Sequence, residues 1–328
     1  MPRRGKLFEP NLRIKLLNLL LITFGLALLY YGGNFLVTGS VRLAHSLKIS
    51  PFIIGATVIA FGTSAPELAV AILAALQGNS ELAMGNVIGS NIANIGLVLG
   101  STGIISSMSI APDRLKRESP PLLLASFLIL VIAWDLVINR YEGIFMVFLL
   151  GLYVRRSFSH KEDISGEPEE EVHLFAGKGP VFQVLLIVAG LALLIGGAKL
   201  LVEGGVGIAR SLGISEWFIG ITIVAVGTSL PEIVSSLIAA KRGHGEMAIG
   251  NIFGSNIFNI LMVLGLTAAI HPLHIQEPIH PDLIISTALT VFLVAMIGYG
   301  HHSLGKGKGI LLLLAYIMYI GLKGTGTL

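Results

Sequence analysis

Long apolar runs alternate with short polar breaks along this chain, and the pattern predicts membrane-spanning helices. A helix needs about 20 apolar residues to cross the hydrocarbon core of a bilayer. Ten segments meet or approach that length: 14–38, 52–76, 82–106, 120–138, 142–157, 180–202, 217–240, 247–270, 282–300 and 309–323. The one long polar connection lies between the fifth and sixth segments. Its acidic run EPEEEV has no ligand spacing for calcium sensing, so we interpret it as a solvated linker.

Composition supports a membrane protein. The 328 residues are 54% hydrophobic and 12% charged, and the mean hydropathy is +0.84. Soluble domains carry about 25% charged residues. The chain has no cysteine, which excludes disulfides, thiolate metal sites and cysteine nucleophiles. The net charge of +3 resides in loops and termini, so it indicates no nucleic-acid partner.

The two halves of the chain are related by an offset of 165 residues. GNVIGSNIAN at 85–94 returns as GNIFGSNIFN at 250–259, and GTSAPE at 62–67 returns as GTSLPE at 227–232. Each half has five spans, and an odd number places the second copy in the opposite orientation. We therefore expect an all-α polytopic membrane protein with ten transmembrane helices, arranged as two inverted-topology five-helix repeats. The expected units are residues 1–157 (signature 55–100), a linker at 158–179, and residues 180–328 (signature 220–265).

Loop charges predict the orientation of the chain. Lys and Arg are more frequent in loops on the side of the linker, which places the linker in the cytoplasm and both termini outside. The basic N-terminus favours the opposite orientation. The first span resembles a signal peptide, but its counterpart at 180–202 lies in mid-chain, so we expect the first span to be retained.

GTSAPE introduces a carboxylate, Glu67, into the middle of a span, where a charge costs several kcal/mol and indicates a functional site. A protonated structural role is the alternative. Helical spacing would put Thr63, Ser64 and Glu67 on one face. Gly62 and Pro66 are expected to break the helix and to leave carbonyls such as that of Ala60 open as ligands. The second half repeats the set with Thr228, Ser229, Glu232, Gly227, Pro231 and the carbonyl of Ala225.

The GNxxGSN segments add amide and hydroxyl oxygens. Ser90 and Asn94 share a helical face, and so do Ser255 and Asn259. The glycines Gly85, Gly89, Gly250 and Gly254 would let these helices approach their neighbours closely. Asn91 and Asn256 face elsewhere, and we interpret them as helix–helix hydrogen-bonding residues. A set made only of oxygen ligands suits Ca²⁺ or Na⁺, whereas zinc or copper would require His or Cys.

On these residues the chain resembles the alpha repeats of the cation/calcium antiporter superfamily, and most closely the short prokaryotic kind of the sodium/calcium exchanger branch. The resemblance implies a secondary active antiporter, not an enzyme, that exchanges Na⁺ for Ca²⁺ by alternating access and is electrogenic. It implies that Ca²⁺ and Na⁺ are the substrates, with no cofactor, in the cell membrane of a prokaryote. The implied metal ligands are Glu67, Glu232, Thr63, Ser64, Thr228, Ser229, Ser90, Ser255, Asn94 and Asn259, with the carbonyls of Ala60 and Ala225. The spans at 14–38 and 180–202 are implied to slide across the rest.

Two departures from the family narrow these expectations. Position 259 is Asn where several relatives carry Asp, so potassium coupling is not expected. The linker is too short for the large cytosolic regulatory domain of animal exchangers. The alternatives are a proton/Ca²⁺ exchanger and, less favoured, a cation channel. The sequence indicates no required protein partner, and a monomer is compatible with it.

Overall fold

The structure is a computed structural model that describes residues 9–325 apart from 160–178, 214–224 and 300. Seven of its described helices are long and apolar enough to cross a membrane, and a bent pair of helices makes up an eighth span. The predicted fifth span is a helix, α8 (Arg140–Ser159), but it is not among these seven. Charged residues in both of its terminal turns lower its hydropathy. The predicted linker at 158–179 and the start of the seventh span lie largely outside the described residues.

Most described helices of one half have a counterpart in the other, whereas α2 and η1 correspond to residues outside the described set and η3 has no described counterpart. The first half consists of α1 (Glu9–Leu47), α2 (Pro51–Ile54), the π-helix η1 (Gly55–Ile59), α3 (Ala60–Thr63), α4 (Ala65–Leu76), α5 (Ser80–Ala93), the π-helix η2 (Asn94–Leu99), α6 (Gly100–Ile105), α7 (Pro112–Ile132), the 3-10 helix η3 (Ala133–Asp135) and α8. The second half consists of α9 (Pro180–Ser211), α11 (Ala225–Thr228), α12 (Leu230–Lys241), α13 (Gly245–Phe258), the π-helix η6 (Asn259–Leu264), α14 (Gly265–Ile270), α15 (His280–Gly298) and α16 (Lys306–Gly324). From α3 to α6 the bounds shift by 165 residues without a gap, which confirms the repeat.

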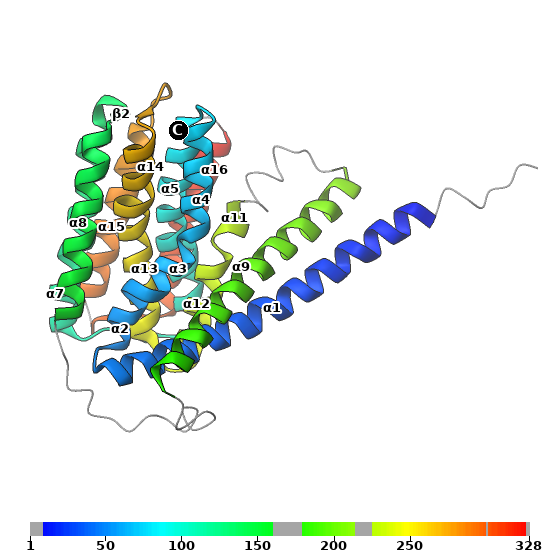
Figure 1. The fold of residues 1–328 in the computed structure, drawn as a ribbon, viewed down its shortest axis with the longest axis horizontal. Coiled ribbons are helices and arrows are strands. Elements are labelled where there is room, and N and C mark those ends of the chain that lie inside the picture. Colours follow the sequence, from blue (N-terminus) through cyan, green and yellow to red (C-terminus); the bar gives the residue numbers. More distant parts are fainter. Residues whose placement is uncertain (1–8, 160–178, 214–224, 300, 326–328) are drawn as a thin grey trace, which may run out of the picture.

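Two short antiparallel strand pairs join the halves at opposite ends. β1 (Met108–Ser109) pairs with β4 (Ser303–Leu304), and β2 (Val137–Ile138) pairs with β3 (Leu273–His274). We call the end where α1 begins and α16 finishes the terminus side. The end where α8 finishes and α9 begins is the linker side. The β2–β3 pair lies on the terminus side (Figure 1). Each pair is the inverted copy of the other, as the odd number of spans predicts.

The long helices α1 and α9 form an antiparallel pair that extends diagonally from the rest of the molecule (Figure 1). Their contact surface carries glycines at seven-residue spacing, namely Gly25, Gly32 and Gly39 in α1 and Gly190, Gly197 and Gly204 in α9. A Cβ on Gly25 would lie 2.8 Å from the carbonyl oxygen of Gly197. Seven-residue spacing keeps one face toward the partner, and glycine lets the two backbones approach.

The broken helices form the centre of the molecule. η1 and α2 pack against α13, and α4 packs against α5, while α7, α8, α15 and α16 surround them. α13 and η6 are buried along almost their whole length. The GTSAPE and GNxxGSN segments of both halves therefore meet inside the protein, away from lipid.

Candidate functional site

Both GTS(A/L)PE segments break their helix at the serine. Ser64 separates α3 from α4 with backbone angles of φ −82° and ψ 0°, and Ser229 separates α11 from α12 with φ −88° and ψ 2°. The two parts of the first span are bent by 42°. Pro66 and Pro231 stand in the first turn after the break, where a missing N–H costs nothing. Each helix is therefore broken between the signature glycine and the signature proline.

The break changes two expectations about the first signature. Thr63 lies at the end of α3 and Glu67 lies in α4, so the regular helical face predicted for Thr63, Ser64 and Glu67 does not exist. The Ala60 carbonyl, which we expected to lack a helical partner, accepts the backbone N–H of Ser64 at 3.0 Å. The missing proline N–H does not free this carbonyl, because the helical partner of Ala60 is Ser64, whereas Pro66 would have bonded the carbonyl of Gly62. A carbonyl has a second lone pair, so ligation by Ala60 stays a prediction.

Glu67 and Glu232 are both buried, each with 1% of its surface exposed. They lie close enough for their charges to repel one another, and the Thr63 side chain lies beside Glu232. One carboxylate oxygen of Glu67 and both of Glu232 have no hydrogen-bond partner among the described residues. Burying an unpaired carboxylate is costly, and burying two together costs more. A cation between the two carboxylates would remove that cost.

Four asparagines form a symmetric cluster between the halves. The Asn94 side-chain amide donates to Oδ1 of Asn256, and the Asn259 amide donates to Oδ1 of Asn91, each at 3.1 Å. Asn91 and Asn256 also donate to each other's backbone carbonyls at 3.3 and 3.4 Å. The interpretation of Asn91 and Asn256 as helix–helix hydrogen-bonding residues is confirmed. Their side-chain oxygens accept the amide N–H groups of Asn94 and Asn259 and so fix the orientation of these two amides.

The side-chain oxygen atoms of Asn94 and Asn259 take no part in these hydrogen bonds. Both Oδ1 atoms are buried and have no hydrogen-bond partner in the part of the chain that the structure describes, and the same is true of the hydroxyls of Ser64 and Ser229. Buried polar atoms are normally hydrogen-bonded, so a group of orphaned oxygens indicates a missing partner. The amide oxygens can only accept hydrogen bonds and the serine hydroxyls can also accept, so all four atoms are able to ligate a hard cation.

The remaining hydroxyls connect the two halves. The Thr63 hydroxyl lies 3.5 Å from the Ser255 hydroxyl and 3.4 Å from the Ala60 carbonyl oxygen. Ser90 lines a cavity of about 180 Å³ together with Thr228 and Ser229. Ala225 is the first residue of α11, and its side chain lies outside the described set. All described members of the predicted ligand set except Thr228 are buried.

The signature glycines of the second half are tightly packed. A Cβ on Gly250 or Gly254 would collide with the carbonyl oxygen of Phe52 or Ala56, so α13 approaches α2 and η1 as predicted. No described atom lies within 4 Å of where a Cβ on Gly85 or Gly89 would stand, and both glycines line cavities. Positions 217 and 221, which correspond to Phe52 and Ala56, lie outside the described residues, so the close approach at Gly85 and Gly89 stays a prediction. Gly62 and Gly227 face α9, against Leu191 and Val202.

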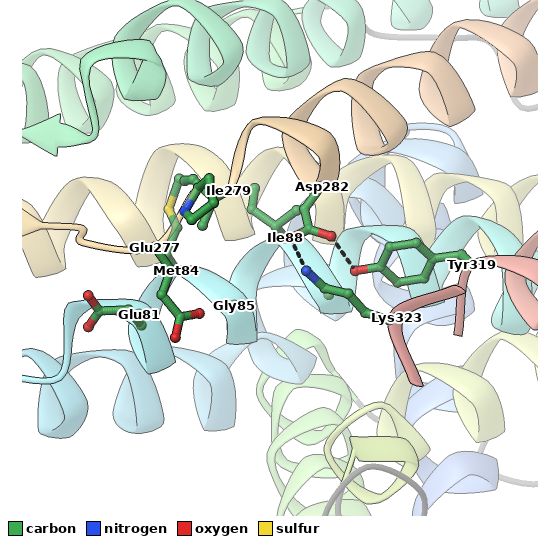
Figure 2. Close-up of a pocket in the computed structure, with 11 residues that line it drawn as sticks. Glu81, Met84, Gly85, Ile88, Glu277, Ile279, Asp282, Tyr319 and Lys323 are labelled. Atoms are coloured by element: carbon green, nitrogen blue, oxygen red, sulfur yellow. Dashed lines mark hydrogen bonds and ion pairs between the residues drawn. The ribbon is translucent and has the colours of Figure 1, made fainter. Parts of the chain in front are cut away.

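Sequence reasoning missed several features. Asn86 donates from Nδ2 to the backbone carbonyl of Glu67 at 3.2 Å and fixes α5 against α4. The π-helices η2 and η6 begin at Asn94 and Asn259, and such segments often occur at functional sites. A third feature is a cavity of about 350 Å³ on the terminus side, lined by carboxylates and by Lys323 (Figure 2). The recurrence of Asn86 as Asn251 was a signal for the first feature.

Comparisons with known proteins agree with this geometry. The family model described as sodium/calcium exchanger protein matches residues 17–158 and 182–324. The chain is 32% identical to the sodium/calcium exchanger MaX1 of Methanosarcina acetivorans, over 92% of this chain and 97% of the relative. It is 34% identical to the inner membrane protein YrbG of Escherichia coli, over 92% and 95% of the two chains. The solved structure of the sodium-calcium exchanger NCX_Mj, soaked with Na⁺ and without Ca²⁺, superposes with a TM-score of 0.82 and 35% identity, over 94% of this chain and 99% of that one.

Proposed function

The chain belongs to the sodium/calcium exchanger protein family, and we propose that it exchanges Na⁺ for Ca²⁺ across the membrane by alternating access. It is a multi-span transporter with ions as its substrates. The observation that carries the proposal is the set of buried oxygens without partners around Glu67 and Glu232. Every atom of that set is an oxygen acceptor, which suits Ca²⁺ and Na⁺ and disfavours softer metals.

Charge explains why exchange would be obligatory. The two carboxylates neutralise one Ca²⁺ or two Na⁺, and a third Na⁺ fits on neutral oxygens such as those of Asn94 and Asn259. An empty site keeps two buried negative charges together, so moving it through the low-dielectric centre is unfavourable. A ligand shifts a conformational equilibrium only through its differential affinity for the states. Either loaded state can therefore cross, whereas the empty state resists crossing.

The conformation supports access from the terminus side. The cavity lined by Ser90, Thr228 and Ser229 lies between residues 85–93 of α5 and residues 316–323 of α16. On the linker side, α1 closes against α12, with Gly33 in contact with Ile238. We place the linker side in the cytoplasm from the loop charges, which makes this the outward-facing state in the cell membrane of a prokaryote. The α1–α9 pair is the element that would move.

Ion flux tests the proposal directly. Purified protein is reconstituted into liposomes loaded with Na⁺ and diluted into Na⁺-free medium that contains ⁴⁵Ca²⁺, beside K⁺-loaded and acid-loaded liposomes. We expect uptake only with internal Na⁺, and loss of uptake in Glu67→Ala and in Glu232→Ala. A stoichiometry of three Na⁺ per Ca²⁺ moves one net charge, worth about 2.3 kcal/mol per 100 mV. A valinomycin-clamped potential should therefore change the rate.

Other outcomes would replace the proposal. Uptake driven equally by internal acid would assign the protein to proton/Ca²⁺ exchange. Uptake that needs no gradient of a counter-ion would indicate that the protein is a cation channel. Uptake that survives removal of both carboxylates would move the ion site away from Glu67 and Glu232. A protonophore control separates direct Na⁺ coupling from coupling through a secondary pH gradient.

A further inference from the structure

The cavity of about 350 Å³ on the terminus side combines acidic residues with Lys323 among its described lining residues. It is lined by Glu81 of α5, by Glu277 and Asp282 at the start of α15, and by Lys323 in the last turn of α16 (Figure 2). Glu277 is exposed, whereas Asp282 keeps only 12% of its side-chain surface accessible. The three carboxylates outnumber the lysine. The cavity therefore carries a net negative charge that attracts cations.

This cavity adjoins the ion site. The smaller cavity of about 180 Å³ reaches the hydroxyls of Ser90, Thr228 and Ser229. The two cavities share four lining residues, Gly85, Gly89, Tyr319 and Lys323. Gly85 and Gly89 supply no side chain, so Tyr319 and Lys323 form the polar part of the shared wall. A cation that moves from the acidic cavity to the site passes this wall.

Lys323 is held in place. Its Nζ donates to Oδ2 of Asp282 at 2.6 Å, and the Tyr319 hydroxyl donates to Oδ1 of the same carboxylate at 2.9 Å (Figure 2). Both carboxylate oxygens are thus used, and Tyr319 is itself buried. Hydrogen bonds between charged groups are short and strong, which fixes the ammonium at the wall. The ammonium group of Lys323 therefore occupies the position at which a mobile cation would otherwise bind the Asp282 carboxylate.

We propose that the Lys323–Asp282 pair controls cation access from the terminus side, with Lys323 as a tethered competitor that a Na⁺ or Ca²⁺ ion must displace from Asp282. The inference rests on the proposed function and adds a residue that sets the apparent affinity on one side only. Repeat symmetry provides the contrast. In this part of the chain the offset is 166 residues, as the strands β2 and β4 and the equivalent glycines Gly143 and Gly309 show. Tyr319 then corresponds to Tyr153, and Lys323 corresponds to the uncharged Ser157. Tyr153 lies near Glu118, which pairs with Arg117 of its own helix. The linker side therefore lacks the tethered lysine.

Initial rates of Na⁺-dependent ⁴⁵Ca²⁺ uptake test the proposal in right-side-out and everted vesicles, with sidedness fixed by access to an N-terminal tag. Lys323→Met exposes Asp282 to the incoming ion and is expected to lower the KM for Ca²⁺ on the terminus side by roughly threefold. Asp282→Asn leaves the ammonium without its counter-charge and should raise that KM. The double variant should return close to the wild-type KM. The maximal rate and the linker-side KM should stay unchanged in all three.

The absence of cysteine allows the same charge to be changed after folding. Lys323→Cys is the only thiol in its chain, so an aminoethyl methanethiosulfonate restores an ammonium and a sulfonatoethyl reagent adds an anion. We expect the terminus-side KM to rise with the aminoethyl group and to fall with the sulfonatoethyl group. Raised ionic strength, set with choline chloride, should shrink both effects.

The outcomes separate the two proposals. Wild-type protein without Na⁺-dependent uptake overturns the proposed function. Active wild-type protein whose terminus-side KM does not follow the charge at position 323 overturns the access role alone. Equal KM changes on both sides, or a loss of maximal rate without a KM change, would show a structural role and also overturn it. Lys323→Arg, which keeps the charge, should retain the wild-type KM.

Discussion

Arg242, directly after α12, donates a hydrogen bond from Nη1 to the Thr38 hydroxyl of α1 at 2.8 Å. Its Nη2 atom also hydrogen-bonds Oδ1 of Asn34, one turn earlier in α1. α12 begins two residues before Glu232, so this contact ties the ion-binding segment to the long helix pair. It lies on the linker side, which is the closed side of the site in this structure. The contact is therefore suited to stabilise that closure.

Arg242→Gln should open the linker side more often. A hydrogen bond to a charged group contributes about 1.5–3 kcal/mol, and 1.4 kcal/mol is a tenfold shift in an equilibrium. Ile238→Cys provides the reporter, because Gly33 covers this position in the closed state. We expect a membrane-impermeant thiol reagent on the linker side to label Ile238→Cys about tenfold faster when Arg242→Gln is also present. Lys241→Gln, an exposed neighbour, should leave the labelling rate unchanged. Equal rates in both backgrounds would contradict the closing role of Arg242.

The orientation of the Asn259 amide should depend on Asn91. Asn91→Ala removes the acceptor of the Asn259 Nδ2 bond, so the amide is free to turn its oxygen away from the ions. Loss of an orienting partner commonly lowers metal affinity by about 10–100-fold. We expect Ca²⁺ affinity, measured by equilibrium binding to purified protein, to fall by about tenfold. Asn256→Ala should have the same effect on Asn94.

Thr57→Ala is the matched control for this experiment. Thr57 is buried nearby and bonds only the carbonyl of Ile53 within its own helix among the described contacts. Its loss should change Ca²⁺ affinity by less than about twofold, since its hydroxyl serves a local helical bond. Comparable losses in all three variants would indicate general destabilisation instead of amide orientation.

The glycine surface between α1 and α9 should tolerate no large side chain. A Leu at Gly197 would have to displace the α1 backbone, because a Cβ there already lies 2.8 Å from the carbonyl oxygen of Gly25. Overpacking a tight interface costs roughly 1–3 kcal/mol, so thermal unfolding in detergent should shift downward. Gly196→Leu is the control, since no described atom lies within 4 Å of its Cβ position. Equal unfolding temperatures for the two variants would contradict close packing at Gly197.

Sequence patterns could predict the repeat, the helix breaks and the two buried glutamates, because each depends on local chemistry. A glycine and a proline within one apolar run favour a break in the helix, and a mid-span carboxylate must be enclosed. The orientation of the Asn94 and Asn259 amides could not be predicted, because it depends on partners in the other half. The π-helices that begin at these asparagines could not be predicted either, because reading side-chain faces from sequence spacing assumes a regular α-helix of 3.6 residues per turn.

The conformations of the two copies could not be predicted either. Two copies of a repeat can adopt different conformations, and their shared sequence cannot tell which copy adopts which. The Lys323–Asp282 pair could not be predicted for a related reason, since the position equivalent to Lys323 in the first half is Ser157.

The two copies also differ at the contact that closes the site. The offset of 165 residues maps Arg242 to Gln77, Asn34 to Lys199 and Thr38 to Glu203. Here the Lys199 and Glu203 side chains are 76% and 50% exposed and lie 4.0 Å from each other. Gln77 is exposed as well. The contact that Arg242 makes on the linker side is thus not formed by the equivalent residues on the terminus side.

Inverted repeats can exchange conformations to change the side on which a site opens. We therefore expect Gln77 to approach Glu203 in the opposite state, where a glutamine amide can donate to the carboxylate. A Gln77→Cys/Glu203→Cys variant of this cysteine-free chain tests the contact, with disulfide formation followed by mobility on a gel. Bridging should depend on the ions present, should stop ⁴⁵Ca²⁺ exchange, and should be reversed by a reductant. A Thr38→Cys/Arg242→Cys pair should bridge in the present state and respond to ions in the opposite direction. If both pairs bridged under the same conditions, the halves would not exchange conformations, and α1 and α9 would move by a different path.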